Sequence, residues 1–214
     1  MTDVWSDRAD QYRESAIHSS GDDLDLVVEW CEPGPGVDVL DVATGGGHVA
    51  RRLRELGASV VTVDPAPGMR ADVIAPAEHL PFADSSFDAV ACRVAAHHFA
   101  DVLSAVKEKA RVAKQRVVIC DNTFVSESSE EADRLRDPSH VRNYGIGEWE
   151  SFFELAGLEI AGQRFMERPL EIEPWLARTQ TPAADATRVR ELLGDRVVDG
   201  WMKLPTLVIK GVKK

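Results

Sequence analysis

The chain has 214 residues, and its 36 Asp and Glu residues outnumber its 25 Lys and Arg residues, which gives a formal net charge of −11. This length allows one domain with a well-developed core, and the acidic balance argues against nonspecific binding to nucleic-acid phosphates. Cys31, Cys92 and Cys120 are odd in number and lack metal-ligand spacing, so we expect no disulfide framework. No apolar run is long enough to span a membrane, and residues 1–8 lack a secretory apolar region, so we expect no membrane association and a cytoplasmic location.

The hydrophobic pattern predicts alternating strands and helices. Helices are expected over 3–15 and 22–31, and the second ends at Pro33-Gly34-Pro35-Gly36. Short apolar runs, typical of buried parallel strands, follow in alternation with helical patterns. The expected strands are 38–42, 59–63, 71–74, 87–93, 116–121, 158–165 and 206–212, and the expected helices are 48–56, 103–112, 147–156 and 174–193. This alternation predicts an α/β fold, a doubly wound sheet that binds ligands at the carboxyl ends of its strands.

The most informative segment runs from Val39 to Ala50. A strand that contains Asp41 is followed by three consecutive glycines, 45–47, and then by a helix. Glycine lets the backbone approach a ligand closely, and the free N–H groups of a helix N-terminus face it. The next strand ends in Asp64, and an acid about 20 residues after such a turn is placed to bind a ribose diol. The segment therefore predicts a site for a nucleotide-like ligand.

Two ligand classes use this arrangement, dinucleotides such as NAD and S-adenosylmethionine. Gly45-x-Gly47-x-x-Ala50 satisfies a loose dinucleotide pattern, so the glycines alone do not decide. Asp41 favours the second class, because its carboxylate would repel a pyrophosphate and attract a cationic sulfonium ligand. A turn that only packs a helix on the sheet is the less favoured alternative, because Asp41, the glycines and Asp64 occur together in order.

Further motifs follow in order along the chain. They are Val63-Asp64-Pro65, the run from Ala77 to Phe82 followed by Ser86 to Val90, the run from Cys92 to Phe99, Asp121-Asn122, the run from Leu135 to Arg142, and Tyr12, Ser15, His18, Gly21, Asp22 and Leu24. Together they resemble class I S-adenosylmethionine-dependent methyltransferases, most closely the small bacterial group called methyltransferase type 11 or ubiquinone/menaquinone-methyltransferase-like. The resemblance implies a Rossmann-like, mostly parallel, seven-stranded sheet in which 206–212 is the one antiparallel strand. It also implies a single domain over 1–214, with a helical lid at 1–32 and acceptor-side helices within 124–157 and 173–194.

The cofactor implied by the resemblance is S-adenosyl-L-methionine, which becomes S-adenosyl-L-homocysteine. We expect the methionyl part to lie against Asp41 and the turn that follows it, the ribose to bind Asp64, and the adenine to be bordered by Ala77 and its neighbours. Arg93 is expected where cofactor and acceptor meet, although an ion pair with a carboxylate is an equal alternative. The complete set of expected cofactor residues is Asp41, Ala43, Thr44, Gly45, Gly46, Gly47, Asp64, Pro65, Ala77, Glu78, His79, Arg93 and Tyr12.

His97 and His98 are the candidate catalytic residues, because imidazole titrates near neutrality and can take a proton from an acceptor. The alternative is that both orient loops or pack on the following helix. No third ligand has convincing spacing, so no metal site is expected. The acceptor is expected to contact His18, Asn122, His140, Arg142 and Tyr144, although Arg142 could instead pair with a nearby acid.

Two positions depart from the family pattern. Only the six residues 65–70 connect the second and third strands, where the family has a helix, and Pro76 stands where the family commonly has an acid for the adenine amino group. The short connection predicts a more open adenine edge, and at Pro76 the acid for the adenine amino group is missing.

The sequence thus predicts methyl transfer to a small-molecule acceptor, and it leaves the acceptor and the oligomeric state open. A non-catalytic homologue that binds the cofactor or a partner is the main alternative, because the connection 65–70 is short and Pro76 replaces an acid. An NAD(P)-dependent oxidoreductase is a weaker one, because Asp41 opposes a pyrophosphate.

Overall fold

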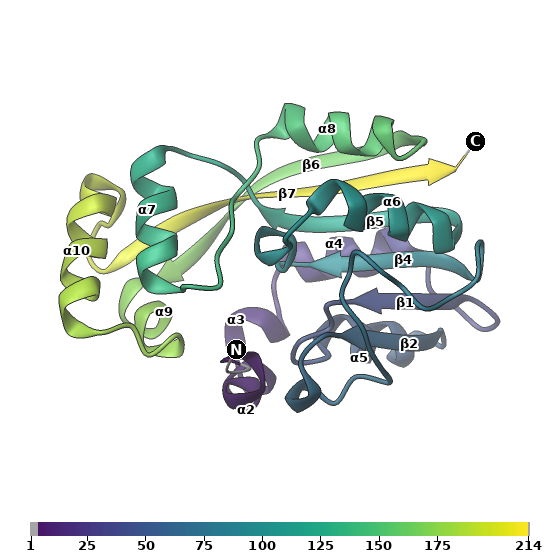
Figure 1. Ribbon diagram of the computed structural model, residues 1–214, viewed down its shortest axis with the longest axis horizontal. Helices are drawn as coiled ribbons and strands as arrows, with labels where there is room; N and C mark the ends of the chain where they lie inside the picture. Colours follow the sequence, from purple (N-terminus) through teal and green to yellow (C-terminus); the bar gives the residue numbers. More distant parts are fainter. Residues whose placement is uncertain (1–3, 214) are drawn as a thin grey trace.

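The computed structural model describes residues 4–213, which form one seven-stranded sheet with helices on both faces (Figure 1). The strand order is β3-β2-β1-β4-β5-β7-β6. Neighbouring strands among β1 to β5 pair in parallel, whereas β7 is antiparallel to both β5 and β6. The strands are β1 (Asp38–Val42), β2 (Ser59–Asp64), β3 (Val73–Ile74), β4 (Phe87–Arg93), β5 (Ala113–Asn122), β6 (Leu158–Glu171) and β7 (Trp201–Lys213). The predicted Rossmann-like fold with one antiparallel strand is confirmed.

The sheet is covered on both faces because its strands are apolar at successive positions. Val39 and Ala89 pack on one face with α4 (Asp22–Cys31) and α5 (His48–Glu55). Leu40 and Val90, the next residue in each strand, pack on the other face with α6 (Val102–Val112) and α8 (Ile146–Leu155). Successive side chains of a strand point to opposite faces, so continuous apolar runs require helices on both. Because β1 pairs in parallel with β2 and with β4, the carboxyl ends of these three strands lie at the same edge of the sheet.

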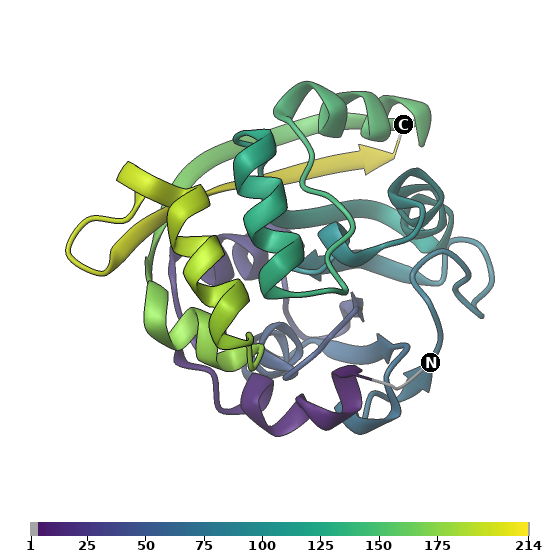
Figure 2. The ribbon, with the colours of Figure 1, turned by 60° about the vertical axis from the view of Figure 1, so that its left-hand side comes forward.

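The last two strands are longer than the pattern predicted. They extend beyond the parallel part of the sheet. Three helices lie beside this extension: α7 (Glu127–Arg136), α9 (Ile172–Arg178) and α10 (Ala183–Leu193) (Figure 2). Trp175, Leu176 and Val189 are buried in a small core of this group, which we call the helical lobe. The single helix expected over 174–193 is wrong. Pro182 disfavours helical geometry at the residue before it, so α9 and α10 are separate.

The amino-terminal segment lies on the short connection between β2 and β3. The helix expected over 3–15 is instead α1 (Val4–Asp7) and α2 (Ala9–Arg13), followed by α3 (Ala16–Ser19), and Asp3 lies outside the described residues. The connection is reduced to one turn, η1 (Pro67–Met69), as expected. The N–H of Gly68 donates to Oγ of Ser6 at 2.7 Å, and a Cβ at Gly68 would lie 2.5 Å from Cα of Ser6. This segment therefore covers the edge that was expected to be open.

Within residues 4–213, none of the helices combines the length and the apolar character needed to cross a bilayer.

Candidate active site

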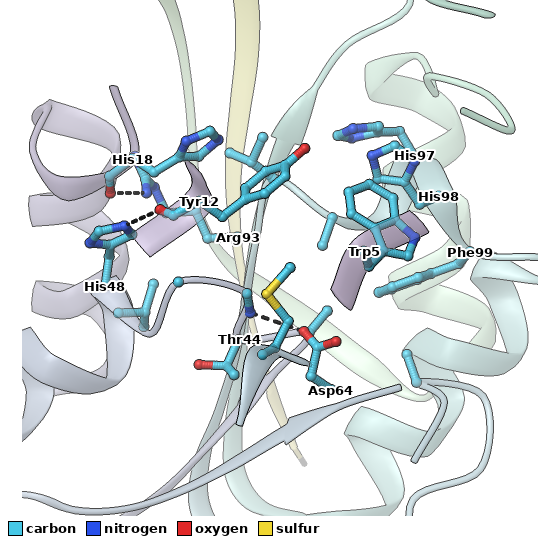
Figure 3. A pocket seen from close by; sticks show the side chains of 18 of the residues that line it. Trp5, Tyr12, His18, Thr44, His48, Asp64, Arg93, His97, His98 and Phe99 are labelled. Atoms are coloured by element: carbon cyan, nitrogen blue, oxygen red, sulfur yellow. Dashed lines mark hydrogen bonds between the residues drawn. The ribbon is translucent and has the colours of Figure 1, made fainter. Parts of the chain in front are cut away.

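A cavity of about 340 Å³ lies at the carboxyl ends of β1, β2 and β4, under the amino-terminal segment (Figure 3). The structure brings most of the expected cofactor residues into its lining: Asp41, Ala43, Thr44, Gly45, Gly46, Asp64, Pro65, Ala77, Glu78, Arg93 and Tyr12. Gly47 and His79 lie outside the lining. The carboxylate of Glu78 accepts hydrogen bonds from the N–H groups of Ala100 and Asp101, so it supports the start of α6.

The glycine turn is tied to the acid that ends β2. The N–H of Gly45 donates to Oδ2 of Asp64 at 3.0 Å, and the N–H of Ala66 donates to Oδ1 at 3.0 Å. The turn needs left-handed backbone geometry at Gly45, with φ of 51°, and also at Ala43, with φ of 56°. Left-handed geometry at a non-glycine residue is uncommon and gathers at functional sites. The two strand ends therefore present one rigid surface to the cavity.

Asp41 is a buried carboxylate whose two hydrogen-bond donors within residues 4–213 are both uncharged. Its Oδ2 accepts hydrogen bonds from Oγ1 of Thr44 at 2.6 Å and from the N–H of Ala50 at 3.2 Å, and its exposed fraction is 1%. No basic side chain among residues 4–213 forms an ion pair with it. Burial raises the pKa of Asp41 from 3.8 to about 6, although both hydrogen bonds oppose this. A cationic ligand group beside it would supply the missing counter-charge.

Arg93 lines the cavity and forms the ion pair with a carboxylate that its sequence context allowed. Its Nε donates to Oδ2 of Asp23 at 2.7 Å in a buried ion pair, and its Nη1 donates to the backbone oxygen of His18 at 2.8 Å. Its Nη2 is buried and finds no hydrogen-bond partner within residues 4–213. A buried donor without an acceptor is costly, and this one belongs to a residue that lines the cavity. Arg93 is thus held by Asp23 and has a donor left for a ligand.

The amino-terminal segment closes the cavity through close backbone packing. Nε2 of His48 donates to the backbone oxygen of Tyr12 at 2.9 Å. A Cβ at Gly46 would lie 2.5 Å from the same oxygen, so only glycine allows this approach. The rings of Trp5 and Tyr12 lie 5.7 Å apart and form one wall of the cavity (Figure 3).

His97 and His98 both line the cavity, and their environments give them opposite charge preferences. Nδ1 of His97 lies 2.6 Å from Oδ1 of Asp121, and both groups are buried. Burial lowers the pKa of His97, but the Asp121 carboxylate raises it by more, so it lies above its ordinary value of 6.5. Burial and then the neighbouring charge of His97 hold the pKa of His98 well below 6.5. His97 therefore favours the cationic form and His98 the neutral form.

The hydrogen bond of His98 defines its tautomer. Its Nδ1 lies 3.1 Å from the backbone oxygen of Ser139. A carbonyl oxygen only accepts, so Nδ1 carries the proton and Nε2 keeps its lone pair.

The expected acceptor residues divide into two groups. His18 and Asn122 line the cavity, whereas His140, Arg142 and Tyr144 do not. Arg142 is exposed and pairs with Glu148 at 2.9 Å, which is the alternative that its sequence context allowed. Tyr144 packs against Trp149 in the core.

His140 belongs to a buried polar cluster behind His97. Its Nε2 lies 3.0 Å from Oε2 of Glu130, and Asn143 Nδ2 donates to both Glu130 and Asp133. Ligand-type atoms of Glu130, Asp133 and His140 lie within 4.8 Å of one another. Hydrogen bonds within the cluster already satisfy these atoms.

One wall of the cavity is built from residues that were not expected in the site. The helical lobe and the strands beside it contribute Arg136, Arg168, Leu170, Trp175, Arg178 and Leu204, and Trp5, His48, Met69 and Phe99 are among the other unexpected lining residues. Signals were available for some of them, because Arg136 and Phe99 lie inside motifs of the resemblance, and Trp175 and Arg178 lie within the helices expected on the acceptor side. The others come from segments in which local pattern marks only a helix or strand.

Comparisons with known proteins agree with this geometry. Residues 40–120 match the family model described as "Methyltransferase domain". An uncharacterized methyltransferase, YcgJ of Bacillus subtilis, is 34% identical over 202 residues, which cover 84% of this chain and 79% of that protein. A demethylmenaquinone methyltransferase of Mycolicibacterium paratuberculosis is 37% identical over 98 residues, which cover 41% of this chain and 43% of that protein.

Solved structures resemble this fold over most of its length. The crystal structure of YcgJ superimposes with a TM-score of 0.81 at 29% identity, covering 90% of this chain and 98% of that one. A putative methyltransferase from Bacillus halodurans gives a TM-score of 0.79 at 26% identity, covering 90% of this chain and 99% of that one.

Proposed function

The chain belongs to the methyltransferase family, and we propose that it transfers the methyl group of S-adenosyl-L-methionine to a small-molecule acceptor in the cavity at the carboxyl ends of β1, β2 and β4. In this proposal the amino-terminal segment is the lid, and the helical lobe is the acceptor side.

One observation carries the proposal: the same cavity contains a buried anion without a cation and a buried cationic donor without an acceptor. Asp41 lacks an ion pair among residues 4–213, and Nη2 of Arg93 lacks a hydrogen-bond partner there. The amino-acid end of the cofactor has an ammonium and a carboxylate, which match these two groups. Asp64, held by the N–H groups of Gly45 and Ala66, stands where the ribose hydroxyls would bind. The donor set therefore fits the cofactor.

When bound, the cofactor supplies a methyl group on a sulfonium: the acceptor's lone pair forms the bond to carbon, and the carbon–sulfur pair leaves with sulfur. The chain must align the acceptor with this methyl group and exclude water. The wall of Trp5 and Tyr12, fixed over Gly46, serves the second task.

His98 is the proposed proton acceptor when the acceptor is a protonated nucleophile. Its Nε2 lone pair is free for this task because Nδ1 is engaged with Ser139. His97 is a positioning residue, since its charge beside His98, at a ring separation of 4.1 Å, keeps that ring neutral. The proton from the acceptor thus passes to Nε2 of His98 and then to solvent.

The alternatives differ in ligand and turnover. Calorimetric titration with S-adenosylhomocysteine and with NADH separates the methyltransferase from the oxidoreductase, and we expect binding of the first only. Incubation with methyl-labelled S-adenosylmethionine and a panel of phenols, amines and acids then tests turnover. Transfer of label to any member supports the enzyme, whereas cofactor binding without transfer to any member points to the non-catalytic homologue. Binding of NADH alone would overturn the proposal.

A further inference from the structure

The acceptor-side wall of the cavity carries an excess of positive charge. Its arginines come from α7, β6 and α9 and point to the region beyond the proposed cofactor site: Arg136, Arg168 and Arg178. Arg168 is fully engaged, because it donates to Oδ1 of Asn122 at 2.8 Å and to Thr206 at 3.0 Å and lies 3.5 Å from Asp23. The other two are not. This contrasts with the net charge of −11 of the chain.

Arg178 has no ion pair within residues 4–213. Its one hydrogen bond runs from Nη1 to Oγ of Ser15 at 3.3 Å. Burial, and then the positive charge of Arg136, lower the pKa of Arg178 from 12.5 to about 10. The negative charge of Asp137 acts in the opposite sense but does not offset these two effects, and Arg178 remains a cation near neutral pH.

The guanidinium of Arg136 also has a hydrogen-bond donor without an acceptor in the described chain. Its guanidinium lies 4.3 Å from the ring centre of Trp175, and its Nε is buried without a hydrogen-bond partner in the described chain. Its ion partner, Asp137, is 3.6 Å away and is shared with Arg8 at 3.3 Å. Burial alone would raise the pKa of Asp137, but hydrogen bonds from Ser139 and the charge of Arg136 outweigh it and hold the pKa at about 2. Oδ2 of Asp137 is buried without a hydrogen-bond partner in the described chain, but this single carboxylate is shared by Arg8 and Arg136 and cannot also neutralise Arg178.

The pKa of His18, which lines the cavity, is also lowered by the positive charge of nearby arginines. Its ring lies 5.5 Å from Tyr12 and lines the cavity. Burial, followed by the charges of Arg178, Arg93 and Arg168, holds the pKa of His18 well below 6.5. Arg93 and Arg168 share the single carboxylate of Asp23, and Arg178 has no ion pair within residues 4–213, so the net charge beside His18 is positive.

We propose that the methyl acceptor is a small organic carboxylic acid whose carboxylate binds between Arg136 and Arg178. The inference rests on the proposed function of the site. A carboxylate matches the fork of a guanidinium, and it would neutralise two like charges that otherwise oppose each other. Trp175 and Leu170, which line the same region, provide an apolar surface for the body of the acid. Arg93 is assigned to the cofactor's own carboxylate, so the two carboxylates occupy different sites.

Calorimetry with the S-adenosylhomocysteine-loaded protein tests the assignment. The probes are acetate, benzoate and phenylacetate, each paired with its neutral amide. We expect at least one acid to bind about tenfold or more tightly than its amide. Arg136→Gln and Arg178→Gln should each abolish this preference and leave the affinity for S-adenosylhomocysteine within about twofold of wild type. Arg190→Gln is the matched control, because Arg190 is exposed on α10 and pairs with Glu173 at 2.8 Å.

Three results would overturn the proposal. These are an absence of preference for every acid over its amide, a preference that survives in both variants, or a tenfold loss of S-adenosylhomocysteine affinity in Arg178→Gln. The last would show that Arg178 holds the cofactor's carboxylate. If the wild type does not bind S-adenosylhomocysteine, the proposed function fails, and the same acid titration without it still reports on the two arginines.

Thermal unfolding gives a second test that needs no acceptor. Arg178→Met removes one of the two opposed charges and keeps an apolar stem, so we expect a higher Tm than wild type in the absence of ligand. A lower Tm would show that the charge of Arg178 is already compensated in the unliganded protein, which contradicts the proposal.

Discussion

His97, which lines the cavity, and Asp121 form a buried ion pair, with Nδ1 of the imidazole 2.6 Å from Oδ1 of the carboxylate. Oδ2 of Asp121 also accepts the backbone N–H of His97 at 2.9 Å, so β5 fixes both the ring and the turn that carries it. The pair sets the charge beside His98, and it therefore links the stability of the fold to the proposed proton transfer.

Asp121→Asn should destabilise the protein in a pH-dependent way. The pKa of His97 in the folded protein lies above 6.5. Protonated His97 therefore contributes fully to folding stability below pH 6.5, and this contribution is lost as pH rises through the pKa of His97 in the folded protein. Burial opposes ionisation of Asp121, but His97 and the N–H donors outweigh it and lower the pKa of Asp121 below 3.8. The ionised carboxylate therefore contributes to folding stability above pH 3.8, and this contribution is lost as pH falls through the pKa of Asp121 in the folded protein. Urea unfolding should show the largest wild-type advantage, about 3 kcal/mol, between these two limits. A difference that does not depend on pH would argue against the ion pair.

His98→Ala should reduce kcat by a factor of about 100 for a protonated acceptor, because a general base contributes roughly that much. An acceptor that is ionised before it binds should lose much less. The measurement is kcat against pH for both kinds of acceptor, with the affinity for S-adenosylhomocysteine as the check that the fold is intact. Equal losses for both acceptors would assign His98 a structural role.

Asp41 should make cofactor binding depend on pH. Burial raises the pKa of Asp41 in the folded protein from 3.8 to about 6. Between these two pH values the folded, unliganded protein binds more protons than the unfolded chain, so its stability falls as pH rises. The ionised form attracts the ammonium group of S-adenosylhomocysteine. Its affinity should therefore rise up to about pH 6 and then level, whereas methylthioadenosine, which lacks the amino-acid end, should show no such rise. Asp41→Asn should abolish the rise, and a rise retained in this variant would place the titrating group elsewhere.

Gly46→Ala should loosen the lid. The new Cβ would lie 2.5 Å from the backbone oxygen of Tyr12, and relief of such a contact costs about 1–3 kcal/mol. We expect faster tryptic cleavage at Arg8 and Arg13 and weaker binding of S-adenosylhomocysteine. Gly147→Ala is the control, because no atom lies within 4 Å of a Cβ there. Equal cleavage rates for the two variants would contradict this packing.

The part of the cavity proposed for the cofactor was predictable as a structural unit because most of its residues are nearly contiguous. Asp41, the glycines and Asp64 belong to one strand, turn and helix followed by a second strand, and the hydrogen bond from Gly45 to Asp64 joins what the local pattern already placed side by side. The two apolar faces of the strands likewise predicted the helix layers.

The acceptor half was not predictable in the same way. Arg136 and Arg178 lie on α7 and α9, and only the packing of the helical lobe against β6 and β7 brings them to one wall. The sequence favoured Arg142 instead, yet its side chain is exposed beside Glu148. Local pattern gives the helix, but not which of its arginines faces a cavity built from distant segments.

The most direct test of the account is the affinity of the protein for S-adenosylhomocysteine in wild type and in Asp64→Ala, with Asp84→Ala as the control. Asp84 is an exposed acid that pairs with Arg111 at 2.8 Å, far along the chain from the glycine turn. The account predicts binding to wild type and to Asp84→Ala, and a loss of about tenfold or more in Asp64→Ala, because two ribose hydroxyls lose a charged acceptor. Equal affinity in all three proteins, or no binding to wild type, would contradict the proposed cofactor site.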